Sequence, residues 1–154
     1  MPVWLRSRLR HPIILLPHVK AVTQKIMTLA GRPEGVVSLD FVGDRRMRRL
    51  NRQYRGKDST TDVLAFALQE AGGPPTVLLG DVVVSLHTAV RQAVQGRIPV
   101  DQEIIKLIIH GILHLLGYDH ERSERDARRM RRREQAIFRS VTPLPKLIDE
   151  RRVL

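Results

Sequence analysis

The stretch that decides the fold is VDQEIIKLIIHGILHLLGYDH, residues 100–120. Between Val100 and Leu116 the apolar residues fall on nearly every side of a helix, and not along a single stripe. A helix that is apolar all round must be buried. We therefore expect residues 100–116 to form a helix in the middle of the domain.

Apolar periodicity predicts the elements around this helix. Helices are expected at 18–30, 44–54, 87–95 and 121–138, strands at 36–42, 63–68 and 77–86, a polar loop at 57–61 and a turn at 72–75. A chain of 154 residues is long enough to bury one core. We expect residues 1–154 to form a single α+β domain, in which a small mixed β-sheet and helices pack around the central helix.

Three histidines are spaced so that they can bind one metal ion. His110 and His114 are about one helical turn apart, which places both imidazoles on one face of the helix. Gly117 can take the left-handed conformation that ends a helix, so the chain can turn and bring His120 back toward them. Three neutral imidazoles leave one position of a tetrahedral zinc ion open for water, as in catalytic sites. We expect one Zn²⁺ per chain, held by these three residues on the central helix and the bend after it.

A purely structural role for these histidines is the alternative. A single histidine on an apolar helix is usually a core residue whose ring is hydrogen-bonded to the backbone. Here half of the six histidines lie within residues 110–120, where unpaired buried imidazoles would be costly. The chain has no cysteine, so thiolate ligands and disulfides are excluded and imidazole and carboxylate remain as metal ligands.

The histidine spacing also matches the metallopeptidase pattern HExxHxxGxxH. At the position of the glutamate that acts as general base in those peptidases, this chain has Gly111. A metallopeptidase would need a glutamate from outside the motif, so this function is disfavoured.

The charge of the chain favours a polyanionic partner. There are 27 basic and 16 acidic side chains, and the formal net charge is +11. Such a field attracts nucleic acid. Aromatic residues are few (one Trp, two Tyr and three Phe), so arginine contacts to phosphate should contribute more than base stacking. The arginine-rich helix expected at 121–138 either extends an RNA-binding face or is a solvated helix face.

The N-terminal sequence has a superficial likeness to a signal peptide. Basic residues precede an apolar run at 13–16, but Pro17 interrupts this run, which is far too short for a secretory or membrane-spanning segment. We expect a cytoplasmic protein without membrane contact.

Three sequence blocks resemble one known family. HGILHLLGYDH, residues 110–120, resembles the signature HGxLHLxGYDH of the YbeY family of bacterial single-strand-specific endoribonucleases. LNRQYRGKDSTTDVLAF, residues 50–66, is similar to the family's NxxYRxxDxPTDVLSF, and LGDVVVS, residues 79–85, to its LGDIxIS. Thr60 replaces a proline and Ala65 a serine, and neither change removes a charged or ligating group.

The resemblance implies a zinc-dependent, single-strand-specific endoribonuclease that acts in ribosomal RNA processing and ribosome quality control, with RNA and the ribosome or its proteins as partners. It also implies that His110, His114 and His120 are the metal ligands and that Arg55 is catalytic. A guanidinium beside a zinc ion can stabilise the charge that builds on phosphate oxygens during cleavage. Alternatively, Arg55 is one more phosphate-positioning or solvated arginine.

Several points stay open in the sequence. A non-catalytic, zinc-stabilised RNA-binding or assembly factor remains the alternative, although a structural zinc site would have four protein ligands. No residue is identified as general base. Asp119 is a candidate for orienting an imidazole, Asp62 and Asp81 are expected to cap turns, and Tyr54 is expected in the core.

Overall fold

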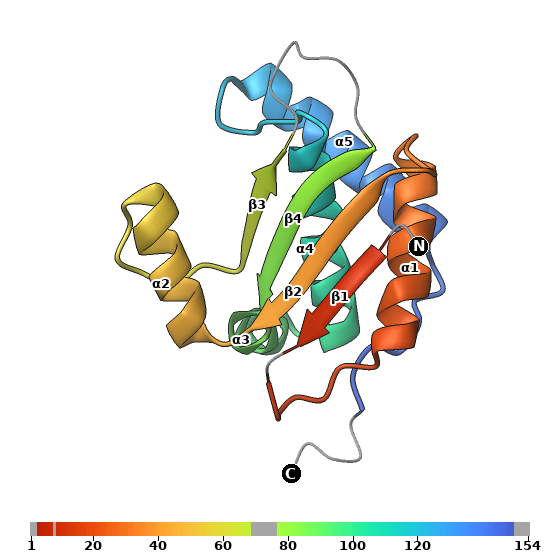
Figure 1. Ribbon diagram of the computed structural model, residues 1–154. Coiled ribbons are helices and arrows are strands. Elements are labelled where there is room, and N and C mark those ends of the chain that lie inside the picture. The colour runs from red at the N-terminus through yellow and green to blue at the C-terminus, as the bar shows by residue number, and fades with distance from the viewer. Residues whose placement is uncertain (1–2, 8, 69–76, 150–154) are drawn as a thin grey trace.

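A four-stranded mixed sheet forms the centre of the fold (Figure 1). The computed structural model describes residues 3–7, 9–68 and 77–149. The strands lie in the order β1 (Val3–Ser7), β2 (Val36–Val42), β4 (Leu78–Ser85) and β3 (Val63–Ala67). The β1, β2 and β4 strands are parallel to one another and β3 is antiparallel to β4. This arrangement confirms the expected α+β fold with a small mixed sheet.

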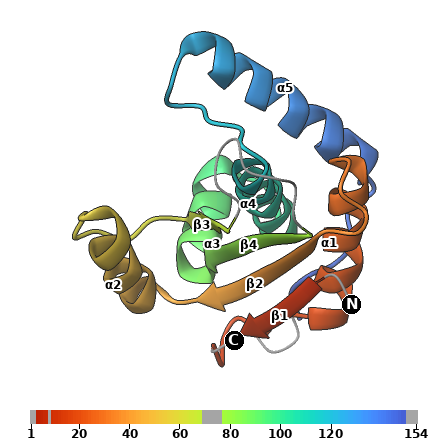
Figure 2. The same cartoon turned by 45° about the horizontal axis from the view of Figure 1, so that its top comes forward.

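Five helices are described around the sheet: α1 (Leu16–Leu29), α2 (Asp44–Arg55), α3 (Leu86–Gly96), α4 (Val100–Leu115) and α5 (Glu124–Ser140). Figure 2 shows α3 and α4 on one face of the sheet, with α5 crossing over α4. The α2 helix lies at the β3 side and packs on the other face. Within the described part of the chain, no helix combines the length and apolarity needed to cross a membrane.

The central helix α4 is buried as predicted. Its fully or nearly fully buried side chains include Ile104, Ile105, Ile108 and Ile112, which pack into the main core cluster. Each such side chain stabilises the fold by about 1.5–3 kcal/mol when it leaves water. The core therefore fixes α4, and with it any side chain that α4 presents to a cavity.

Successive side chains of a strand point to opposite faces of the sheet, and both faces of this sheet are apolar near β4. On β4, Val82 and Val84 join the main core beneath α4, while Val83 points to the opposite face. There Val83 meets Met47 of α2 in a second, smaller cluster. The sheet is thus covered on both sides near β3 and β4, which is where the sequence blocks of the expected site meet.

The ends of several predicted elements need correction. Leu86 begins α3 and does not end β4, because the Ser85 side chain caps α3 by accepting a hydrogen bond from the Thr88 amide at 3.4 Å. The last helix begins at Glu124 because Ser123 caps it. The β1 strand was not predicted from the sequence, and the turn expected at 72–75 lies outside the described residues.

The prediction that Tyr54 belongs to the core is wrong. Its side chain is 59% exposed, and its ring makes an edge contact with Phe66, with the centroids 5.1 Å apart. Only Met47 and Asn51 of α2 are buried. Because α2 covers a narrow part of the sheet, its last turn extends beyond the apolar surface.

A carboxylate holds the start of α2 against the junction of β4 and α3. Asp44 Oδ1 accepts hydrogen bonds of 2.8 Å from Ser85 Oγ and from Thr88 Oγ1, and Oδ2 pairs with Arg91 at 2.6 Å. Partial burial raises the pKa of Asp44, but the hydrogen bonds from these three side chains and the charge of Arg91 lower it from 3.8 to about 2. The ionised carboxylate therefore stabilises the folded state.

Replacing this carboxylate should change stability in a pH-dependent way. For Asp44→Asn we expect a loss of about 1–2 kcal/mol at neutral pH, allowing for partial solvent screening. Because the folded-state pKa is lowered, the difference from wild type should be complete above an ordinary aspartate pKa and should disappear as the pH falls through about 2. Urea unfolding of both proteins at several pH values measures this difference in the free energy of unfolding.

The control for this experiment is Asp58→Asn. Asp58 pairs with Arg48 at 2.8 Å on the exposed side of α2, where solvent screens the charges, so little change is expected. Equal stability of the wild type and Asp44→Asn at neutral pH would contradict the role assigned to Asp44.

Candidate metal centre

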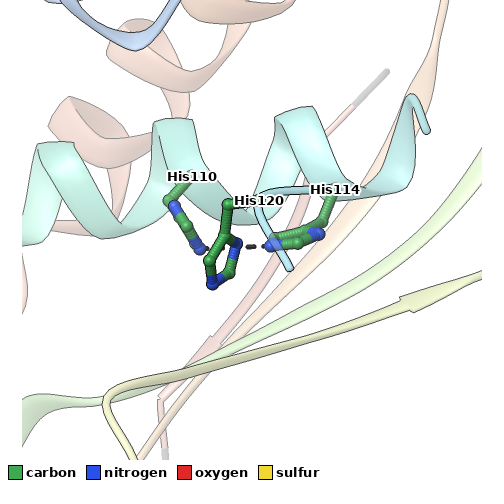
Figure 3. A group of neighbouring side chains, drawn as sticks. All are labelled: His110, His114 and His120. Carbon is green, nitrogen blue, oxygen red and sulfur yellow. Dashed lines mark hydrogen bonds between the residues drawn. The ribbon is translucent and has the colours of Figure 1, made fainter. Parts of the chain in front are cut away.

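Three imidazoles converge on one point beside α4 (Figure 3). His110 and His114 come from α4, and His120 comes from the bend after it, where Gly117 has φ 98°. One ring nitrogen from each residue lies within 4.8 Å of the other two, and Nε2 of His110 is 3.2 Å from Nε2 of His114. The structure thus brings together the three residues that the spacing singled out.

The distances suit a metal ion. Two nitrogen ligands at 2.0–2.1 Å from a tetrahedral zinc ion are about 3.3 Å apart, close to the 3.2 Å between the Nε2 atoms of His110 and His114. In the described residues this group contains three donors, all imidazoles. Imidazole suits zinc and the neighbouring transition metals better than calcium or magnesium, so the donor set fits a zinc-type ion.

The surroundings keep the middle imidazole in its metal-binding form. Burial lowers the pKa of His114, and the neighbouring His110 and His120 lower it further, against a smaller opposing effect of Asp119 and Glu121. A lowered pKa means that His114 stays neutral to lower pH than an ordinary histidine. The lone pair that a metal would need is therefore available at neutral pH.

Two carboxylates near the triad differ in what they bind. Glu134 Oε2 on α5 lies 3.1 Å from Nδ1 of His110. Asp119, the sequence candidate for orienting an imidazole, instead accepts a 2.8 Å hydrogen bond from the Glu121 amide and lies 3.5 Å from Arg122. Glu134 was not predicted from the sequence, although its position between the inward-facing Met130 and Ile137 of an arginine-rich helix indicates a carboxylate that faces α4.

The triad opens into a cavity of about 560 Å³. Arg55, the last residue of α2, lines this cavity together with the three histidines, Lys57 and Glu121. The remaining wall is formed by Gly111 and residues 61–65. Arg55, the arginine that the resemblance implies is catalytic, therefore lines the same cavity as the triad, and so do Lys57 and Glu121, which were not predicted from the sequence.

The two aspartates expected to cap turns have different surroundings. Asp62 lies in the cavity wall, where Oδ1 accepts a 2.8 Å hydrogen bond from the Val63 amide and Oδ2 a 3.3 Å bond from Gln92. Asp81 is exposed on β4, opposite Phe66 of β3. The contacts of Asp62 agree with a role at the start of β3.

Gly111 has no room for a side chain. A Cβ atom at this position would lie 2.6 Å from Cγ1 of Val82 on β4, closer than real contacts allow. Val82 is fully buried and β-branched, so it cannot easily move away. The glutamate of the peptidase pattern would therefore clash with β4 at this position, and because the chain has glycine here the peptidase's general base is missing, so a metallopeptidase is disfavoured.

Comparison with known proteins gives one consistent family. A family model described as Endoribonuclease YbeY matches residues 13–142. A relative of that name from Anaeromyxobacter sp. (strain Fw109-5) is 54% identical over 110 residues, which cover 71% of this chain and only 56% of the relative. Another from Geobacter metallireducens is 40% identical over 141 residues, covering 90% of this chain and 94% of the relative.

A solved structure agrees with the fold. The solution structure of a Thermotoga maritima protein superposes with a TM-score of 0.65 over 90% of this chain and 88% of that chain. The sequence identity is 24%, so this likeness supports the architecture alone.

The packing at Gly111 gives a stability prediction. Gly111→Ala should destabilise the fold by about 1–2 kcal/mol, because the overpacking against Val82 outweighs the gain in helix propensity. The control is Gly96→Ala at the end of α3, where the added Cβ would meet only Ile98 at 3.9 Å and where no loss is expected. Chemical denaturation measures both, and a neutral or stabilising Gly111→Ala would contradict the close packing.

The convergence of the triad predicts metal binding that can be measured without any substrate. The wild-type chain should bind one zinc ion, and His114→Ala should weaken zinc binding by more than about 100-fold. Loss of a residue that only hydrogen-bonds to a metal ligand weakens binding by up to about that factor, and loss of a ligand itself should cost more. Exposed His11→Ala should leave the affinity unchanged. Competition with a chromophoric chelator gives the dissociation constants. Wild-type affinity in His114→Ala would rule out the triad as the metal site.

Proposed function

The chain belongs to the YbeY family of endoribonucleases, and from this premise we propose that it is a zinc-dependent endoribonuclease that cleaves single-stranded RNA. The observation that carries the proposal is the shared cavity, in which three converging imidazoles face the same space as Arg55. The family is named for endoribonucleases, which hydrolyse RNA, so RNA is the expected substrate class.

In this proposal Arg55 is the catalytic residue. It lies at the C-terminal end of α2, whose six arginines and one aspartate give the helix a strongly positive surface. Its guanidinium can donate paired hydrogen bonds to phosphate oxygens as negative charge builds on them during cleavage. Lys57, in the same cavity wall, adds a second positive charge that attracts and positions the RNA backbone.

We propose that His110, His114 and His120 hold the zinc ion. When bound, the ion supplies Lewis acidity to water or to a phosphoryl oxygen. The histidines hold the site at a fixed place in the cavity wall, and the lowered pKa of His114 keeps its imidazole neutral for this role. The open cavity beside the triad favours a catalytic site over the purely structural zinc site of an assembly factor.

The finer features of the proposal rest on the resemblance of the three sequence blocks. They are the preference for single-stranded RNA, the role in ribosomal RNA processing and ribosome quality control, and the ribosome or its proteins as partners. We further propose the cytoplasm as the compartment, where a ribosomal partner would be found. The net charge of +11 supports a nucleic-acid partner.

Cleavage assays on matched single-stranded and duplex RNA test the proposal. His114→Ala should lose both metal and cleavage, whereas Arg55→Ala should keep its metal and lose about 10²–10³-fold in kcat, as when a transition-state donor is removed. Metal analysis of each protein accompanies the kinetics.

The matched control is Arg49→Ala, which removes another exposed arginine of α2 that is not among the residues lining the cavity. It should cleave within a few-fold of wild type. Equal cleavage by all variants would indicate a contaminating ribonuclease, and equal cleavage of duplex RNA would contradict the single-strand preference.

A further inference from the structure

A carboxylate on α5 is directed at the far side of one imidazole of the triad. Glu134 Oε2 lies 3.1 Å from Nδ1 of His110, and each of the two side chains is 27% exposed. The other ring nitrogen of His110, Nε2, is the one that lies 3.2 Å from Nε2 of His114. His110 therefore has one nitrogen facing the triad and the other facing Glu134.

From this geometry we propose that Glu134 is a positioning residue for the metal site, an inference that rests on the proposed metal-binding function. Its carboxylate accepts the Nδ1–H hydrogen bond of His110. This contact selects the tautomer that leaves the Nε2 lone pair free for the ion, because the opposite tautomer would carry a hydrogen on Nε2. It also holds the ring plane and makes the imidazole a better donor to the metal.

The position of Glu134 is set by packing. It lies four residues after Met130 and three residues before Ile137, about one helical turn from each of the two buried residues that attach α5 to the core. A side chain between two such contacts is directed toward α4, so the carboxylate is in place before any ion binds. The α5 helix thereby contributes a hydrogen-bond acceptor to His110, although none of its residues lines the cavity beside the triad.

The other acidic residues of α5 have different partners. Glu124 is 93% exposed and lies 3.6 Å from Arg128, and Asp126 lies 3.6 Å from Arg122. Both interactions lie within α5 or with the loop before it, and surface pairs of this kind contribute little. Glu124 therefore serves as a matched control on the same helix.

The experiment measures zinc affinity of the full chain, after removal of metal, by competition with a chromophoric chelator. Glu134→Ala should weaken zinc binding about 10–100-fold, the usual effect of losing the outer partner of a metal-binding histidine. Glu134→Gln should recover most of the affinity, because its amide oxygen can still accept the Nδ1–H bond. Glu124→Gln should bind as wild type does.

Two further measurements separate positioning from general destabilisation. Circular dichroism and thermal unfolding of the metal-free proteins should show that both Glu134 variants are folded. In a His110→Ala background, adding Glu134→Ala should cause no additional loss of zinc affinity, because the residue acts through His110.

The proposal is overturned if folded Glu134→Ala binds zinc with wild-type affinity, if Glu124→Gln weakens binding equally, or if Glu134→Ala still weakens binding in the absence of His110. These results are independent of RNA cleavage. A wild-type protein that binds zinc through this arrangement but cleaves no RNA would contradict the proposed function and leave the role of Glu134 intact.

Discussion

The burial of α4 between the sheet and α5 is the constraint on which the rest of the structure depends. Ile108 and Ile112 are fully buried, and Gly111 allows the helix to approach Val82 of β4 without a side chain in between. Because the helix is fixed by this packing, the backbone positions of His110 and His114, one helical turn apart, are set by the fold itself. Folding therefore places both imidazoles on the same face of one helix, which lowers the conformational entropy that binding an ion would cost.

The close packing of the three imidazoles disfavours their protonated, charged forms and favours neutral rings. Burial lowers the pKa of His114, and the neighbouring His110 and His120, which would repel a protonated His114, lower it further. Neutral imidazoles are also the form that binds metal, so the fold and the proposed chemistry favour one protonation state. The Glu134 carboxylate adds a hydrogen-bond acceptor on the side of His110 away from the triad, where it does not compete for the Nε2 lone pair.

Local patterns in the sequence predicted the features that depend on local spacing. The buried helix at 100–116, the strand Val36–Val42 and the grouping of the three histidines all follow from periodicity within a few turns or one strand. Features that depend on distant contacts were missed or wrong. The β1 strand exists because it pairs in parallel with β2. Tyr54 is exposed because α2 covers little of the sheet. Glu134 on α5 contacts His110 on α4, 24 residues away in the sequence.

The placement of Arg55 depends on a different kind of contact from the one that holds the histidines. The α2 helix buries only Met47 and Asn51, so apolar packing holds it weakly, and its six arginines repel one another. Polar contacts compensate at both ends: Asp44 binds the start of α3, and Asn51 Nδ2 donates a 2.9 Å hydrogen bond to the Ser59 carbonyl in the loop that leads to β3. The cavity therefore has one side on α4, which apolar packing holds in place and which carries His110 and His114, and another side on α2, which polar contacts hold in place and which carries Arg55. An RNA phosphate bound between them would neutralise the repulsion within α2, so substrate binding and the docking of this helix should support each other.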